Sequence, residues 1–254
     1  MDGTQKQYHI KLGPGESAPF VIVPGDPGRV PLIASFLDNA VPVANNREYC
    51  TYRGTYKGVD ISVTSTGIGG PSAAICFEEL AQVGAKVLIR VGTSGSLQPD
   101  VHLGDVVVAS GSIRDEGTSQ QYLPLSFPAV ADFDVASALK QASVQLSLPH
   151  HVGVVHCKDA FYGEMPGTLP TQRQWEEKWE VWHRSGALCT EMESAALFIV
   201  GQVRGLKTGA ILSVIGETRD GEVKIKKVGV EDAIKTALEA CVLLNQTQKL
   251  GESS

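Results

Sequence analysis

The stretch KVLIRVGTSGS (residues 86–96) decides the fold, because an apolar, β-branched run ends there in a break that contains two glycines. Four further segments repeat the pattern: PFVIVPGDP (19–27), VDISVTSTGIGG (59–70), GDVVVASGSI (104–113) and TGAILSVIGE (208–217). Apolar runs that each precede such a break are typical of buried strands that end in loops at one edge of a sheet. Ligands of open α/β sheets bind at these carboxyl ends, so we expect the functional residues there.

Segments of helical period lie between the predicted strands. Residues 71–84 begin with a proline and end at a glycine, which predicts a helix with a defined start and stop. Residues 191–205 and 229–246 are two further apolar segments of helical spacing. The Trp-rich stretch 168–186 is expected to form a helical excursion near the site.

This alternation of strands and helices predicts an α/β fold in three layers, α/β/α, around a central mixed, largely parallel, twisted sheet. A length of 254 residues does not require a second domain, so we expect a single domain over residues 1–254. Residues 247–254 are expected to form a frayed tail.

Composition excludes several classes of protein. Hydrophobic residues make up 43% and charged residues 20%, which is ordinary globular usage. A net charge of −6 argues against a surface built to bind nucleic acid. The N-terminus lacks the pattern of a secretory signal, and no apolar run approaches the ~20 residues of a membrane span, so a cytoplasmic protein without a membrane partner is expected.

The cysteines and histidines give no sign of a metal site. Five cysteines, an odd number, are widely scattered and show no ligand-like spacing, so they are expected to be reduced thiols. The adjacent pair His150 and His151 lacks a companion cluster of acids or thiols and is expected at a surface turn.

Three arginines occupy glycine-rich or turn-like contexts: Arg29 in PGDPGRV, Arg47 in NNREY and Arg90 in IRVGTSGS. Guanidinium groups match phosphate oxygens in bidentate fashion, and Thr93 and Ser94 add hydroxyl and backbone donors. Together these residues predict a phosphate cradle. The alternative is three surface arginines that pair with neighbouring acids. The glycines of TGIGGPS do not fit the dinucleotide fingerprint, and no P-loop occurs.

The segment TEMESAALF places Glu191 and Glu193 two residues apart, beside Met192, at a predicted loop-to-helix junction. Two carboxylates at this spacing repel each other unless cations or hydroxyl groups accept them. A ribose supplies such hydroxyl donors. The alternative is one helix-capping acid and one exposed acid.

Six motifs follow one another along the chain: PGDPGRV (24–30), NREY (46–49), STGIGGPS (65–72), IRVGTSGSLQP (89–99), KDAFYG (158–163) and EMESAALF (191–198). Jointly they resemble the uridine phosphorylase branch of the hexameric nucleoside phosphorylase family, over nearly the whole chain. The resemblance implies a pentosyltransferase that cleaves uridine with phosphate to uracil and ribose 1-phosphate. It also implies phosphate as co-substrate without a further cofactor, and a homohexamer, a trimer of dimers, whose subunits share sites.

The resemblance assigns roles to individual residues. For phosphate it implies Gly25, Arg29, Arg90 and Thr93, with Arg47 reaching in from a neighbouring subunit. For ribose it implies Glu191, Met192 and Glu193, with His9 contacting the 5′-hydroxyl across the subunit boundary. For the base it implies Ser94, Gly95 and Phe161, the last stacking on the ring. His9, Arg90 and Glu193 are the expected catalytic residues, and K⁺ between subunits is an expectation at Glu48, Ile68 and Ser72.

The chain departs from the family where the uracil edge is read. An ungapped comparison of FYGEMPGTLP places Glu164 at the usual glutamine and Thr168 at the usual arginine. One explanation is another uracil-binding group, with Arg173, Gln174 and Arg219 as candidates. The other is a purine nucleoside such as inosine or guanosine, with Glu217 or Asp220 as general acid; NREY and KTGAIL also resemble purine phosphorylases of protozoan parasites.

Two further classes remain as alternatives. A hydrolytic nucleosidase shares the ribose acids, but it has no use for a phosphate site of three arginines. A non-catalytic nucleoside-binding protein is disfavoured because every matched phosphate and sugar position is intact.

Overall fold

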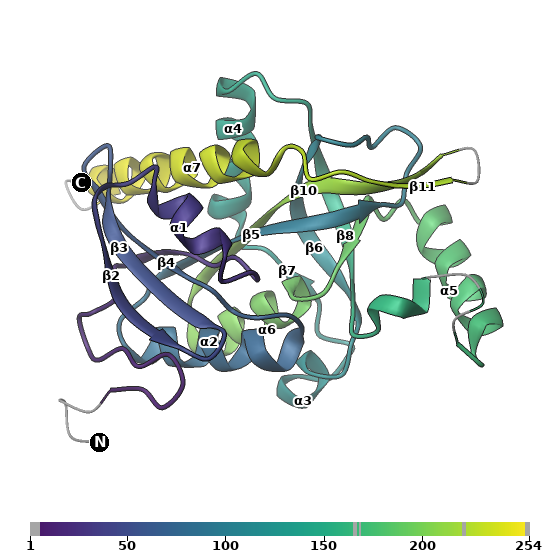
Figure 1. Cartoon of the computed structure of the whole chain (residues 1–254), viewed down its shortest axis with the longest axis horizontal. Coiled ribbons are helices and arrows are strands. Elements are labelled where there is room, and N and C mark those ends of the chain that lie inside the picture. The colour runs from purple at the N-terminus through teal and green to yellow at the C-terminus, as the bar shows by residue number, and fades with distance from the viewer. Residues whose placement is uncertain (1–5, 165–166, 168, 220–221, 252–254) are drawn as a thin grey trace.

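The computed structural model describes residues 6–164, 167, 169–219 and 222–251 (Figure 1). Its strands are β1 (Phe20–Ile22), β2 (Asp38–Asn46), β3 (Tyr49–Tyr56), β4 (Val59–Thr64), β5 (Val87–Ser96), β6 (Val106–Asp115), β7 (Ala129–Val130), β8 (His150–Lys158), β9 (Cys189–Glu191), β10 (Lys207–Arg219) and β11 (Glu222–Ile225). Its helices are α1 (Arg29–Ala34), α2 (Gly70–Gln82), α3 (Ser119–Tyr122), α4 (Phe133–Gln145), the 3₁₀ helix η1 (Phe161–Glu164), α5 (Gln172–Arg184), α6 (Ser194–Arg204) and α7 (Val230–Gly251).

The strands of the described residues join into one mixed sheet, as the sequence predicts. At its centre β4, β1, β5 and β10 are parallel neighbours. Antiparallel pairing is confined to hairpins and to the joins β10–β6 and β5–β9. Parallel strands end at the same edge, so the loops after β1, β4 and β5 converge.

One part of the sheet closes on itself. Strand β5 pairs with both β9 and β10, β10 pairs with β6, β6 with β8, and β8 with β9. This closed circuit brings the ends of β5, β8 and β9 together, although β8 and β9 are far from β5 in the sequence.

Two apolar cores cover the two faces of the sheet and confirm the three-layer prediction. Helices α2 and α6 pack on one face around Phe77, Leu80 and Phe198. Helices α1, α4 and α7 pack on the other face around Ile33, Leu139 and Leu238. Figure 1 shows these helix layers below and above the sheet, with α5 standing apart at one end.

Most predicted elements form where the sequence indicates. The five predicted strands correspond to β1, β4, β5, β6 and β10. The predicted helices correspond to α2, α5, α6 and α7. Helix α7 continues to Gly251, into the segment expected to fray, and residues 252–254 lie outside the described residues.

The prediction of a surface turn at His150 and His151 was wrong. Both residues begin β8 and pair in parallel with Val106 and Val107 of β6. Asp105 holds the second imidazole, with His151 Nε2 and Asp105 Oδ2 2.9 Å apart. A carboxylate partner and ladder hydrogen bonds therefore explain the adjacent pair without a metal.

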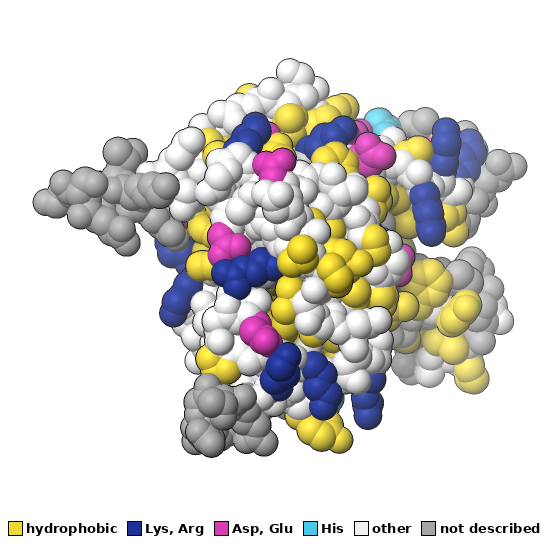
Figure 2. All heavy atoms as spheres, turned by 60° about the vertical axis from the view of Figure 1, so that its left-hand side comes forward, with side chains coloured by type: hydrophobic (Ala, Val, Ile, Leu, Met, Phe, Trp, Pro, Cys, Tyr) yellow, Lys and Arg dark blue, Asp and Glu magenta, His cyan; other side chains and the backbone are white. Residues whose placement is uncertain are grey.

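The surface has no extended zone of one charge on the face drawn in Figure 2, where basic, acidic and apolar side chains are interspersed. No helix among the described residues is long and apolar enough to cross a membrane.

Candidate active site

Most of the predicted phosphate and ribose residues meet at the carboxyl edge of the central strands. Gly25 follows β1, Arg90 and Thr93 lie within β5, and Glu191 ends β9. The loop after β4 approaches the same point, since a Cβ on Gly25 would lie 3.3 Å from the carbonyl oxygen of Gly67. Parallel pairing of β1 with β4 and β5 is what aligns these loops.

Arg90 is the centre of this cluster. Its side chain is buried, its Nε donates to Glu191 Oε2 at 3.0 Å, and its Nη2 forms an ion pair with Glu193 Oε2. Burial disfavours the guanidinium charge, but Glu193 and Glu191 outweigh burial and raise the pKa of Arg90. Arg90 therefore stays charged in a place that water does not reach.

One donor of this guanidinium is unused. Among the described residues, no acceptor bonds the buried Nη1 of Arg90. A Cβ on Gly25 would lie 3.8 Å from this atom, so the donor faces the glycine loop after β1. A buried donor without a partner costs about 1–3 kcal/mol, which an anion bound beside Gly25 would remove.

Arg29 adds a second cation at the same point. Its Nη1 donates to the carbonyl oxygen of Val91 at 3.0 Å, which turns the guanidinium toward β5. Burial and the nearby charge of Arg90 both lower the pKa of Arg29. Two guanidinium groups repel each other unless an anion lies between them, so the pair favours binding of a phosphate.

Arg29 and Thr93 line a cavity of about 520 Å³ that opens beside this cluster. Its other walls come from β10, the segment before α7 and the first residues of α7, including Ile215, Lys227 and Val230. The cavity is large enough for a small ligand, and it gives solvent access to Arg29 and Thr93.

The two acids of the EMES motif have different environments. Glu191 is buried at the end of β9 and accepts from the backbone N–H groups of Glu193 (2.9 Å) and Ser194 (3.0 Å) and from the Ser194 hydroxyl. Burial works against its charge, but Arg90 and the Ser194 donors prevail and lower the pKa of Glu191. Glu191 thus fixes Arg90 to the first turn of α6.

Glu193 is buried and faces the glycine loop after β4. Its Oε1 accepts from the backbone N–H of Gly69 at 2.6 Å. Burial raises the pKa of Glu193; Arg90 opposes that rise and the charge of Glu191 adds to it. The alternative of one capping and one exposed acid is wrong, because both carboxylates are buried around one arginine. Met192 lies between them, half-buried.

His9 and Arg47 are not part of this cluster within one chain. His9 Nδ1 lies 2.7 Å from Glu79 Oε1 on α2, and its backbone N–H also bonds that carboxylate. Arg47 is exposed in the turn between β2 and β3, with a positive φ of 55°. Two of the three residues named for K⁺ are in contact: Glu48 of the same turn has its Oε1 2.8 Å from Oγ of Ser72 in α2. The third, Ile68 in the loop after β4, has an exposed side chain.

The predicted base residues are partly assembled. Phe161 is half-exposed in η1, with its ring edge against Tyr162. Ser94 Oγ donates to the carbonyl oxygen of Ser213 at 3.3 Å, and Gly95 pairs with Thr190. The side chain of Glu164 and all of Thr168 lie outside the described residues.

The alternative base-reading residues lie elsewhere or outside the described part. Arg173 is 90% exposed and pairs with Glu177, and Gln174 is also exposed. Glu217 Oε2 accepts from the backbone N–H of Leu103 at 3.3 Å. The Arg219 side chain and Asp220 are not described.

Sequence reasoning missed Lys158, although the residue stands in the KDAFYG motif. The side chain is 2% exposed at the end of β8, and its Nζ donates to Thr190 Oγ1 at 2.7 Å. A lysine shortly after the apolar run Val154–Val155 and within a matched motif was the available signal, but β8 itself was not predicted.

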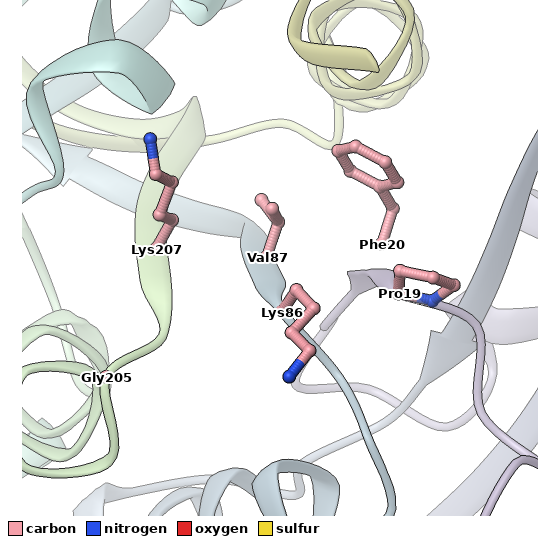
Figure 3. A pocket seen from close by; sticks show the side chains of 6 residues that line it. All are labelled: Pro19, Phe20, Lys86, Val87, Gly205 and Lys207. Carbon is pink, nitrogen blue, oxygen red and sulfur yellow. The ribbon is translucent and has the colours of Figure 1, made fainter. Parts of the chain in front are cut away.

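A second cavity, of about 300 Å³, lies at the opposite edge of the sheet (Figure 3). It is lined by Lys86, Val87 and Lys207 at the amino ends of β5 and β10. The two lysine side chains point in different directions, and Lys207 pairs with Asp134. Without convergent polar groups this cavity does not resemble a ligand site.

The phosphorylase superfamily model matches residues 19–244 of the chain. The chain is 49% identical to a uridine phosphorylase of Treponema pallidum over 95% of each sequence. It is also 39% identical to a guanosine phosphorylase of Halorubrum lacusprofundi, over 94% of this chain and 99% of that protein. A solved uridine phosphorylase from Vibrio fischeri superposes with a TM-score of 0.83 at 35% identity, covering 95% of this chain and 99% of the other.

Proposed function

The chain belongs to the phosphorylase superfamily, and from that membership we propose that it is a pentosyltransferase that cleaves uridine with inorganic phosphate to uracil and ribose 1-phosphate. The observation that carries the proposal is the unused Nη1 donor of buried Arg90, which faces Gly25. Arg29 adds a second positive charge nearby. The Nη2 atom of the same Arg90 pairs with the Glu193 carboxylate. This arrangement joins an anion site to a site for hydroxyl groups. The uridine phosphorylase relatives support the choice of nucleoside.

Phosphate is the nucleophile in this proposal, so no water has to be activated. A phosphate oxygen held by Arg29, Arg90 and Thr93 attacks C1′ of the ribose, and the electron pair of the C1′–N1 bond leaves with the base. The sugar carries positive charge in the transition state, as in other glycosyl transfers. The anionic phosphate and the carboxylates that hold the sugar hydroxyls stabilise that charge.

Glu193 is the better placed of the two acids to hold ribose hydroxyls. Its present partner at Oε1 is a backbone N–H of the glycine loop, whereas Glu191 is saturated by Arg90, Ser194 and the backbone. Glu191 is then a positioning residue that fixes Arg90. Met192, between the acids, would form the apolar floor under the sugar.

The site is completed between subunits in this proposal. His9 and Arg47 contact no member of the Arg90 cluster within the described part of the chain, although the resemblance assigns both to the site. We propose a homohexamer in which Arg47 of one subunit reaches the phosphate of its neighbour and His9 reaches the 5′-hydroxyl. The Glu48 carboxylate and Ser72 hydroxyl offer oxygen ligands suited to K⁺ near that boundary, with the Ile68 carbonyl as a third.

Purine nucleosides are the second candidate substrates, because the guanosine phosphorylase relative is as similar as the uridine phosphorylase of Escherichia coli, 39% identical in both cases. Glu217 would have to release the N–H of Leu103 before it could protonate a purine. A phosphorolysis panel of uridine, thymidine, inosine, guanosine and adenosine tests the assignment. The proposal predicts the highest kcat/KM for uridine, and a higher value for guanosine or inosine would replace uridine by a purine.

A further inference from the structure

Lys158 places a buried positive charge beside the aromatic ring on which the base is expected to stack. Its Nζ lies 6.0 Å from the Phe161 ring centroid and 5.8 Å from that of Trp179. The ammonium therefore lies beside the ring that is expected to stack on the base. Phe161 itself is 45% exposed, which leaves its face open to a ligand.

The ammonium is also close to the sugar acids. Burial raises the pKa of Glu193, and the positive charges of Arg90 and Lys158 offset part of that rise. Geometry agrees with this proximity, since Cys157 of β8 pairs with Glu191 of β9 and Lys158 Nζ bonds Thr190, the residue before Glu191. Lys158 is therefore held beside the strand end that carries Glu191.

A chain of buried polar groups fixes the direction of the ammonium. Thr190 Oγ1 accepts from Lys158 Nζ and lies 3.1 Å from His156 Nδ1. Because the Asp115 carboxylate accepts hydrogen bonds, the proton of its 3.2 Å contact with His156 lies on Nε2. Lys178 Nζ holds the other oxygen of Asp115 at 2.6 Å.

The chain of groups is shielded by one face of α5. His156 is fully buried, with its ring edge-on to Trp179 (5.4 Å, 87°) and tilted against Trp182 (5.9 Å). In this apolar setting a hydrogen bond to a charged group is stronger than in water. The tryptophans thus hold β8, β9 and the Lys158 ammonium in one arrangement.

We propose that Lys158 is a further catalytic residue, the cation that stabilises the departing base, and that Thr190 is its positioning residue. The inference rests on the proposed function. As the C1′–N1 bond breaks, its electron pair passes to N1 of the base, and the negative charge spreads to the two carbonyl oxygens of uracil. The Lys158 ammonium donates a hydrogen bond to that charge and keeps its proton. The new bond joins C1′ to a phosphate oxygen, and the released base anion takes a proton from water.

The test compares uridine with 5-fluorouridine, whose leaving groups are uracil and 5-fluorouracil. Both nucleosides are assayed with K158M, with K158R and with a matched control, K86M. Lys86 is exposed at the opposite edge of the sheet. At saturating phosphate, K158M should lower kcat for uridine by about 10²–10³, the usual cost of a lost donor at a developing negative charge. The loss should be at least several-fold smaller for 5-fluorouridine, because fluorine already stabilises the base anion. K158R should retain more activity than K158M, and K86M should match the wild type.

Thr190→Val gives a second test that keeps the size of the side chain. It should lower kcat with the same dependence on the leaving group, and Thr190→Ser should restore it. Losses of equal size for uridine and 5-fluorouridine, in both K158M and T190V, would overturn the inference while leaving uridine phosphorolysis by the wild type intact. Absence of phosphorolysis in the wild type would overturn the proposed function, and the inference with it.

Discussion

At the scale of single residues, Arg90 combines two tasks that the sequence does not separate. It pairs with two buried carboxylates and keeps one donor for an anion. Arg90 therefore stabilises the fold as well as the site, because its removal leaves two buried acids facing each other.

Arg90→Ala and Arg29→Ala should therefore differ in stability. R90A should lower the free energy of unfolding by about 3–5 kcal/mol, the usual cost of breaking a buried ion pair. R29A removes a single hydrogen bond to a carbonyl, so its cost should be about 1 kcal/mol. Urea unfolding measures both. R29A should raise the KM for phosphate strongly, and equal stabilities of the two variants would refute the structural role given to Arg90.

Glu193→Gln should weaken the hold on the ribose hydroxyls. A hydrogen bond to a charged group contributes about 1.5–3 kcal/mol, so kcat/KM for uridine should fall roughly 10- to 100-fold. Binding of 2′,3′-dideoxyuridine, which lacks both hydroxyls, should change far less, as titration calorimetry would show. An equal loss of affinity for both nucleosides would place Glu193 outside the ribose site.

The sequence predicts the site residues near strands that have a plain apolar run, and it misses the site residue on a strand that has no such run. Gly25 lies in the loop after β1, Arg29 begins α1, and Arg90 and Thr93 lie in β5. The apolar runs of β1 and β5 are plain. Lys158 ends β8, whose first half consists of exposed or half-buried residues that hide the strand pattern. Its role depends on pairing with β9, a strand of three residues, and such long-range pairing is not visible in local sequence.

At the scale of elements, α5 packs against η1, which carries Phe161, and we propose that the two cover the bound base. Trp175, Trp179 and Trp182 recur at helical spacing on one face of α5, and the first of them packs on Gly163 of η1. No side chain of α5 is fully buried. The helix is thus attached mainly through its tryptophan face, and the position of Phe161 depends on that contact.

Gly163→Ala should displace this cover. A Cβ at residue 163 would lie 2.5 Å from Trp175 Cε2, so η1 and α5 must move apart. We expect a raised KM for uridine and an unchanged KM for phosphate, because Arg29 and Arg90 lie on other elements. The double variant G163A/W175A removes the clash and should recover part of the loss in steady-state kinetics. A rise in both KM values would show that the change spreads beyond the base side.

The predicted elements show why the sheet was only partly foreseen. Strands β1, β4, β5, β6 and β10 contain buried stretches rich in apolar residues, since helices cover both of their faces. Strand β2 is a mostly exposed edge strand with a proline, and β3 alternates buried and half-buried residues. Such strands have no pattern that separates them from loops in a single sequence.

At the scale of the whole molecule, the closed circuit of strands explains why distant motifs converge. Because β5 pairs with both β9 and β10, the VGTSGS and EMES segments meet around one arginine. The fold class could be predicted from the alternation of strands and helices along the sequence, whereas the closed circuit of strands could not. The turn that carries Arg47 lies at the end of the β2–β3 hairpin and is exposed, as the proposed contact with a neighbouring subunit requires.

Shared sites predict complementation between two inactive variants. R29A lacks a residue of its own site, and R47A lacks the residue offered to the neighbour. When the two are co-expressed, an R47A subunit beside an R29A subunit has an intact site. The mixed oligomer should therefore be more active than either variant alone, measured per milligram of purified protein. Activity equal to the mean of the two variants would mean that Arg47 does not act across a boundary.

The central claim is that the anion site beside Arg90 holds phosphate as the attacking group. The most direct measurement follows uridine cleavage as phosphate is titrated from zero, with both products identified. The account predicts no turnover without phosphate, saturation as it is added, and one ribose 1-phosphate formed per uracil. Equal turnover in phosphate-free buffer, with free ribose as the product, would contradict it.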